Sequence, residues 1–528
     1  MKSKVNFVLH AHLPFVRHIE YDKFLEENWL FESINETYIP LLKTLENLSD
    51  VKFTISMCFS PTLCAMLCDE MLQERFIKYM EERIELGVKE VLRCKNEKLD
   101  SLDMAIRYLN SNRDNLAYYI ECKRALLYRF KQLQTNGKVH LLATAATNVY
   151  LPVYKKYESV IHAQIKIGID EHIRYFEKKP DGFLLPENGY FPGLEDYFDE
   201  YGIKWISLSS SAIALGKNKV ESAGLMPTLL GESNVLGLSR NWAVTNKIWS
   251  DKTGYPCDKE YRDFYSDIGY DLDLEYIRPY IHEPSVRVFT SYKYNAIGTG
   301  REKKLYDYNK AMEKVALNAS NFIYNIKRFT KSHTKEDCLV NLFLDAELFG
   351  HRWYEGIEFL NQFIKNADLN DVELISASEY IKEKENVEYE RAFLNESSSG
   401  YGGFSDTWIS NSNDWVYRHT FKAIERMEFI ANRQGFETGL KKRYYNQVAR
   451  ELLLALSSDW TCILHNQTSM NYAHDRIVHH IAAVDLVFNS ACKNDLDMQW
   501  LSYSEKKYNI FPNMDYNIFY NKERTSAN

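Results

Sequence analysis

The sequence predicts an α/β fold built around a barrel of parallel strands. Short apolar runs recur between longer, charged segments of helical character, which is typical of strand–helix units. No run is followed by the Gly-x-Gly-x-x-Gly pattern of a dinucleotide-binding sheet. Two of the runs stop abruptly at a carboxylate, at Glu187 and at Asp345. The expected strands are residues 5–11, 52–59, 139–145, 182–187, 203–209, 339–345 and 372–378.

Three further regions define the expected organisation. Residues 70–134 are charged and almost free of Gly and Pro, which predicts helices inserted between the second and third strands. Residues 228–300 are irregular and rich in Tyr, Asp and Gly, as in a long loop or small subdomain over an active-site mouth. From about residue 415 the apolar spacing is helical. We therefore expect a barrel domain over 1–395 and a C-terminal helical domain over 396–528.

Bulk composition excludes some classes of function. The chain has 528 residues and a formal net charge of -8, with no long basic block, so nucleic acid is not expected as a partner. Nine cysteines show no complete zinc pattern, and we interpret them as reduced thiols of a cytoplasmic protein. The first apolar stretch is interrupted by His10 and His12 and is too short for a signal peptide or a membrane span.

Aromatic residues make up 14% of the chain. Such rings stack on the apolar faces of sugars, so the value suits a carbohydrate-active protein. A genome rich in A and T gives the same bias, because its codons favour Tyr, Phe, Asn, Ile and Lys. Composition alone does not separate these two explanations.

The two carboxylates carry the strongest chemical signal. In a barrel of parallel strands, residues at the carboxyl ends of different strands converge on one mouth. Glu187 and Asp345 would meet there, and two carboxylates are the minimum equipment for cleaving a glycosidic bond. The alternative for Glu187 is a helix cap or salt bridge. For Asp345 it is a structural ion pair, with His351 or Arg352 as nearby partners.

Other polar and aromatic residues are candidates for the same mouth. His10 and His12 are two apart on a strand and so share a face, where they could bind a metal or hydrogen-bond a sugar hydroxyl. Trp408 and Trp415 follow a glycine-rich segment and offer stacking faces. Asp459 interrupts a helical pattern, either as a helix cap or as a residue facing the cleft.

These motifs, in this order, resemble glycoside hydrolase family 57, and in particular the 1,4-alpha-glucan branching enzymes of that family. The resemblance runs nearly from end to end. The segments that carry it are His10-Ala11-His12-Leu13-Pro14, Leu185-Pro186-Glu187, residues 249–256 and 260–269, Asp345-Ala346-Glu347-Leu348-Phe349-Gly350-His351, and residues 450–460.

The resemblance implies an incomplete (β/α)7 barrel with a C-terminal helical domain. It makes Glu187 the nucleophile and Asp345 the general acid/base of a retaining double displacement, with carboxyls ~5–5.5 Å apart. It implies an α-glucan partner, no metal or other cofactor, and a monomer or weak homo-oligomer. The residues expected to bind substrate are His10, His12, Asn148, Arg240, Arg262, Tyr270, His351, Trp408, Trp415 and Asp459.

Several positions depart from the family pattern. Asn148 stands where the family commonly has histidine, Asn188-Gly189 replaces Cys-Ala after the nucleophile, and Arg352 replaces a tryptophan. Both carboxylates are retained, so we expect altered specificity or weaker activity rather than an inactive scaffold. Three functions remain open: a branching enzyme, a related α-glucan hydrolase or 4-alpha-glucanotransferase, and a catalytically weak glycan-binding protein.

Overall fold

The computed structural model describes residues 2–283, 286–298, 303–333, 338–434, 437–493 and 495–520. Within this part of the chain, seven parallel strands close into a ring. Two sheets make up the ring, and single bridges join them at Ala143–Phe183 and at Arg240–Asn341. The protein is therefore an incomplete (β/α)7 barrel, as predicted. Around the ring the strands are β1 (Ser3–Ala11), β2 (Ile55–Phe59), β3 (Val139–Leu142), β4 (Gly182–Phe183), β5 (Trp205–Leu208), β7 (Leu236–Ser239) and β10 (Leu339–Asp345).

The barrel interior is layered, because alternate residues of a strand share a face. At the amino end, Asn6 receives a hydrogen bond from Ser56 and donates one to Asn341. The next layer up is apolar, with Val8 and Phe343 side by side in the register of β1 and β10. The following step of the same register pairs His10 with Asp345, so the interior face ends at the mouth with polar groups.

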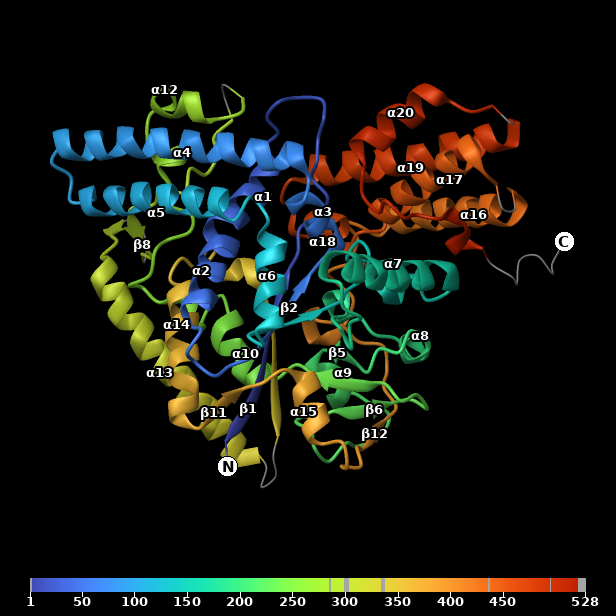
Figure 1. The fold of residues 1–528 in the computed structure, drawn as a ribbon, viewed down its shortest axis with the longest axis horizontal. Coiled ribbons are helices and arrows are strands. Elements are labelled where there is room, and N and C mark those ends of the chain that lie inside the picture. Colours follow the sequence, from blue (N-terminus) through green and yellow to red (C-terminus); the bar gives the residue numbers. More distant parts are fainter. Residues whose placement is uncertain are drawn as a thin grey trace.

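Helices cover the outside of the ring (Figure 1). Parallel strands are buried on both faces, which is why their sequences are almost continuously apolar. The main covering helices are α2 (Ile39–Asn47), α6 (Leu126–Thr135), α7 (Glu158–Phe176), α13 (Tyr308–His333), α14 (Gly356–Ala367) and α15 (Ala377–Glu383).

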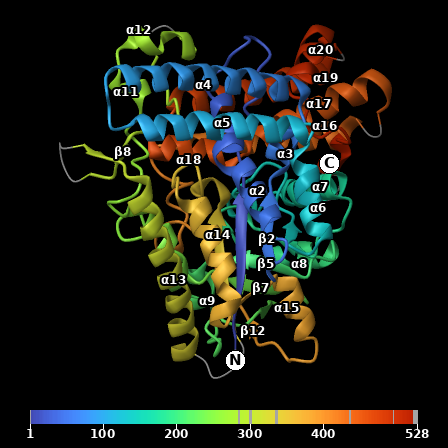
Figure 2. The same cartoon turned by 60° about the vertical axis from the view of Figure 1, so that its left-hand side comes forward.

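Two groups of helices lie above the carboxyl ends of the strands (Figures 1 and 2). One is the antiparallel pair α4 (Glu70–Asn96) and α5 (Leu102–Glu121), in the predicted insertion. Asp69 caps α4 by accepting a hydrogen bond from the Leu72 N–H. The other group is α16 (Trp415–Gln434), α17 (Gly439–Ala455), α18 (Ser458–Asn466), α19 (Met470–Lys493) and α20 (Met498–Lys507). No helix in the described ranges is long and apolar enough to cross a membrane.

The predicted number of barrel strands is right, but one predicted member is wrong. The 372–378 run forms β11 (Val372–Leu374), which pairs with β1 outside the ring. Its place is taken by β7, inside the 228–300 segment expected to be irregular. This strand has four residues and contains Gly237, where a Cβ would lie 2.5 Å from the Leu208 side chain. A side chain there would displace the Leu208 and Leu230 side chains, so the close packing favours glycine. Glycine also weakens the apolar pattern by which a strand is predicted.

Candidate functional site

Asp345 ends β10 at the open mouth of the barrel. The six residues before it in the strand are buried, whereas the Asp345 side chain is exposed. The protein around the mouth displaces water from the carboxyl, which raises its pKa. Positive charges of Arg352 and Arg240 act in the opposite direction. Asp345 is thus accessible to a substrate, and its pKa is higher than that of an ordinary aspartate.

Glu187 follows β4 in a strained turn. Its backbone has φ 57° and ψ 15°, and Asn188 next to it has φ 47°. Asn148, in the loop after β3, has φ 52°. Residues other than glycine are uncommon in this left-handed region, and the strain is typical of functional sites. The two turns hold the Asn148 and Glu187 side chains against each other.

The Glu187 carboxylate is held by two hydrogen bonds on the same oxygen. Its Oε1 accepts from Ser458 Oγ at 3.0 Å and from Asn148 Nδ2 at 3.3 Å. Burial raises the pKa of Glu187 to about 7, and the negative charges of Asp459 and Asp345 add to this rise. The Ser458 bond acts against it. Asp345 and Glu187 are therefore close enough to interact electrostatically.

His12 and Asp459 form the charged pair of the site. His12 Nε2 lies 3.0 Å from both carboxylate oxygens of Asp459. Burial disfavours charge on His12, but the Asp459 carboxylate outweighs it and raises the His12 pKa. The pKa of Asp459 is lowered in return, although burial alone would raise it. His10 stacks on His12 with ring centroids 5.6 Å apart, and burial lowers its pKa to about 3, so His10 is neutral.

Glu347 is a third carboxylate in this site. Its Oε1 accepts from the His12 backbone N–H at 3.2 Å and from the Tyr38 hydroxyl. Burial raises the pKa of Glu347 to about 7, and the Asp345 charge contributes. The sequence places Glu347 beside Asp345 but assigns it no function. Tyr38 and Ser458 give no local signal of a role, since both act through contacts with residues far away in the chain.

Arg240 reaches the site from the end of β7. The residue is buried, and burial lowers its pKa to about 10, while Asp345 raises it. Its guanidinium lies 5.1 Å from the Trp249 ring centroid and 5.7 Å from that of Trp242. Its Nε and Nη2 have no hydrogen-bond partner in the described part of the chain. Arg240 thus carries donors that a substrate could use.

The structure places the remaining predicted residues away from this cluster. His351 Nδ1 lies 2.6 Å from Glu36, and Arg262 is buried in a neighbouring cavity. Tyr270 is 47% exposed on α11 (Ile268–Asp271) and donates to the Arg287 carbonyl.

The two tryptophans differ in accessibility. Trp408 is 3% exposed, and its ring stacks on Tyr150 at 4.5 Å, so it presents no open face to a sugar. Trp415 begins α16, and its ring lies 5.6 Å from that of His474. Only Trp415 retains the accessibility that stacking requires. As for metals, no group of three or more His, Cys, Asp or Glu within the described ranges could hold an ion.

Comparison with known proteins agrees with this geometry. Residues 6–393 match the model of glycosyl hydrolase family 57, and residues 419–519 match the C-terminal model of 1,4-alpha-glucan branching enzymes. The 1,4-alpha-glucan branching enzyme TK1436 of Thermococcus kodakarensis is 30% identical over 97% of this chain and 78% of its own.

Solved structures are similar over the whole length. The alpha-amylase AmyC from Thermotoga maritima superposes with a TM-score of 0.92 at 34% identity, covering 99% of this chain and 100% of its own. The branching enzyme from Pyrococcus horikoshii gives 0.88 at 28%, covering 99% and 97%. With the barrel, the paired carboxylates and a family model that spans most of the chain, this protein belongs to glycosyl hydrolase family 57.

Proposed function

We propose that the protein is a 1,4-alpha-glucan branching enzyme. The observation that carries the proposal is that Glu187 follows β4 and Asp345 ends β10 at the mouth of one barrel, where burial raises the pKa of both carboxyls. The match to the branching-enzyme C-terminal model, which includes Ser458 and Asp459, supports the choice of reaction. Burial raises the pKa of both carboxyls, and that of Glu187 to about 7. The choice of Glu187 as nucleophile and Asp345 as acid follows the family resemblance.

The proposed reaction has two displacements. Glu187 attacks the anomeric carbon of an α-1,4 linkage and forms a covalent glycosyl-enzyme, while Asp345 gives its proton to the departing 4-oxygen. Esterification removes the negative charge of Glu187, which lowers the pKa of Asp345. Asp345 therefore stays ionised after giving up its proton and can act as the base of the second step. It deprotonates the 6-hydroxyl of an acceptor glucan, whose attack forms the α-1,6 branch. Retention requires the carboxyls to lie ~5–5.5 Å apart.

Buried polar atoms without partners support a role for their residues in sugar binding. A buried donor or acceptor left unpaired is costly, so a substrate hydroxyl that pairs with it gains binding energy. At this site, within the described residues, the unpaired atoms are His10 Nε2, His12 Nδ1, Asn148 Oδ1, and Arg240 Nε and Nη2. These four residues, with Asp459, are the proposed first contacts of the glucan.

The wider assignment is also a proposal. Residues 1–395 would form the barrel domain, and 396–528 a helical domain that contributes Ser458 and Asp459 to the cleft. We propose a cytoplasmic enzyme of glycogen biosynthesis, acting without a cofactor as a monomer or weak homo-oligomer. The net charge of -8 supports a neutral polysaccharide over nucleic acid as partner.

Incubation with amylose tests the proposal. A branching enzyme lowers the iodine-stained absorbance and creates α-1,6 linkages, with little new reducing sugar. Glu187→Gln should abolish both changes, whereas Glu200→Gln, at an exposed position of α8 (Leu194–Glu200), should leave them intact. Glucan binding without turnover, unaffected by Glu187→Gln, would instead indicate a glycan-binding protein.

A second candidate is an α-glucan hydrolase. The similarity to the alpha-amylase AmyC, at 34% identity over 99% of the chain, favours it. The same two carboxylates serve both reactions, because water can replace the acceptor hydroxyl in the second displacement. Abundant reducing ends without branches, in the same amylose assay, would establish hydrolysis.

A further inference from the structure

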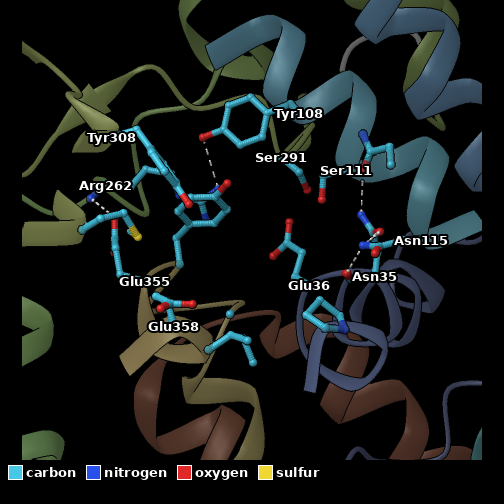
Figure 3. Close-up of a pocket in the computed structure, with 16 residues that line it drawn as sticks. Asn35, Glu36, Tyr108, Ser111, Asn115, Arg262, Ser291, Tyr308, Glu355 and Glu358 are labelled. Atoms are coloured by element: carbon cyan, nitrogen blue, oxygen red, sulfur yellow. Dashed lines mark hydrogen bonds between the residues drawn. The ribbon is translucent and has the colours of Figure 1, made fainter. Parts of the chain in front are cut away.

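A second polar cavity lies on the flank of the barrel, behind the motif that contains Asp345 (Figure 3). Its volume is about 210 Å³. Its walls come from the π-helix Ile34–Tyr38, from α5, from the starts of α2, α13 and α14, and from the loops that hold Arg262 and Ser291. Gly350 forms part of the inner wall with φ 94°, and a Cβ there would lie 1.9 Å from the Glu36 carbonyl oxygen. The glycine thus allows Glu36 to sit directly against the catalytic motif.

Arg262 gives the cavity an unmet hydrogen-bonding capacity. The residue is 4% exposed, and its Nη1 donates a long bond of 3.5 Å to the Tyr108 hydroxyl. Its Nε and Nη2 have no partner in the described ranges. One face of the guanidinium lies 4.2 Å from the Tyr354 ring centroid, which fixes its plane. A buried cation with unpaired donors is costly unless something supplies acceptors.

Acidic and neutral groups share the cavity with Arg262, and Glu355 Oε1 accepts a 3.0 Å hydrogen bond from the Arg262 backbone N–H. Glu36 extends its carboxylate toward Ser291 and Ser111 (Figure 3), while its Oε2 is paired with His351 at 2.6 Å. Glu355 and Glu358 add two more carboxyl side chains to the lining. The neighbouring Asn35 and Asn115 are already bonded to each other at 3.0 Å, so they form a rigid frame.

The charge balance selects the class of ligand. An anion is disfavoured, because three carboxyl side chains and only one arginine line the cavity. A cation is disfavoured, because the unpaired guanidinium would repel it. A neutral polyhydroxy compound satisfies both sides, because each hydroxyl can accept from Arg262 and donate to Glu36. Tyrosine rings in the wall suit the apolar face of a sugar. The volume is below the roughly 300–1,000 Å³ of pockets for drug-sized ligands, so it fits a single ring.

We propose that this cavity binds one glucose unit, either free or at the end of an α-glucan chain, apart from the catalytic carboxylates. The chemistry of the wall points to a neutral sugar, and the identity of that sugar rests on the proposed function. Because Glu36 contacts His351, a bound sugar would lie beside the segment that follows Asp345 in the chain.

Crystals soaked in glucose test the proposal directly. We expect glucose in the cavity, hydrogen-bonded to Arg262 and Glu36. Ser111→Trp, at the exposed edge of the cavity on α5, should abolish this occupancy, and Met312→Trp should do so from the opposite wall. Asn110→Trp, exposed on the same helix but outside the lining, should preserve it. Two blocking variants keep the test informative if one of them fails to fold.

Three results would overturn the proposal: an empty cavity at a glucose concentration that fills the catalytic cleft, occupancy that survives both blocking variants, or inorganic phosphate binding there in place of glucose. The amylose assay keeps this outcome separate from the proposed function. If the wild-type enzyme branches amylose and the cavity stays empty, only the proposed second site is refuted. If glucose binds in the cavity but amylose is not branched, only the proposed function is refuted.

Discussion

The Ser458 hydroxyl donates a 3.0 Å hydrogen bond to Glu187 Oε1, joining residues 271 positions apart in the chain. Ser458 begins α18 in the C-terminal helices, whereas Glu187 follows β4 of the barrel. The backbone is tied as well, since Ser458 N–H donates to the Asn148 carbonyl at 3.2 Å. The proposed nucleophile is therefore held by the C-terminal helices as well as by the barrel.

This bond predicts a shift in the pH dependence of activity. The proposed nucleophile must be ionised, so kcat/KM should fall as the pH drops below the Glu187 pKa of about 7. Ser458 stabilises the ionised form, and Ser458→Ala should raise that pKa and move the acid limb to higher pH. Ser469→Ala, exposed just before α19, is the control and should leave the profile unchanged. A limb that stays in place in Ser458→Ala would contradict the assigned contact.

Asn148 predicts a separable effect on stability. Its left-handed backbone, with φ 52°, costs alanine roughly 1–2 kcal/mol but costs glycine little. Both Asn148→Ala and Asn148→Gly remove the hydrogen bond to Glu187, so they should lose activity equally. Asn148→Gly should be the more stable by about 1 kcal/mol in urea unfolding. Equal stability of the two variants would show that the turn relaxes when the side chain is lost.

The sequence predicts the barrel and its mouth because both follow from periodicity. Strand alternation predicts His10 and His12 on one face, and their rings do stack although β1 ends at Ala11. The end of an apolar run places Asp345 at the rim. The one missed barrel strand, β7, has only four residues and owes its close packing to Gly237. Because β7 is short and has glycine at one of its four positions, its sequence lacks the apolar run by which the other strands are predicted.

The contacts that tune the carboxylates are beyond sequence reasoning. Ser458 and Tyr38 act on Glu187 and Glu347 through hydrogen bonds between segments remote in the chain. Such contacts depend on how the helices pack against the barrel. The spacing of residues along the sequence gives no information about that packing. The same holds for Trp408, whose aromatic and glycine-rich surroundings predict an open stacking face, whereas Tyr150 covers it.

Glu187 should reduce the stability of the native protein when it is charged. Its folded pKa of about 7 exceeds that of an unfolded glutamate, so the stability it contributes is full below the unfolded pKa. That stability is lost as the pH rises through 7. Glu187→Gln should therefore raise the free energy of unfolding at pH 8 by roughly 1–3 kcal/mol, and by less at pH 5. Chemical denaturation at both pH values measures this, with Glu200→Gln expected to show no such difference.

Arg352 stands where the family resemblance leads us to expect a tryptophan. Its positive charge lowers the Asp345 pKa more than any other charge does. The proposed general acid must be protonated, so activity should fall as the pH rises above its pKa. Arg352→Trp removes the positive charge and should move this alkaline limb to higher pH. Arg352→Lys keeps the charge and should leave the limb near its original position. The kcat/KM profiles on amylose decide the matter: if both variants shift equally, the guanidinium acts through shape rather than charge. A shift confined to Arg352→Trp would show that this departure from the family tunes the acid, because only the charge separates the two variants electrostatically.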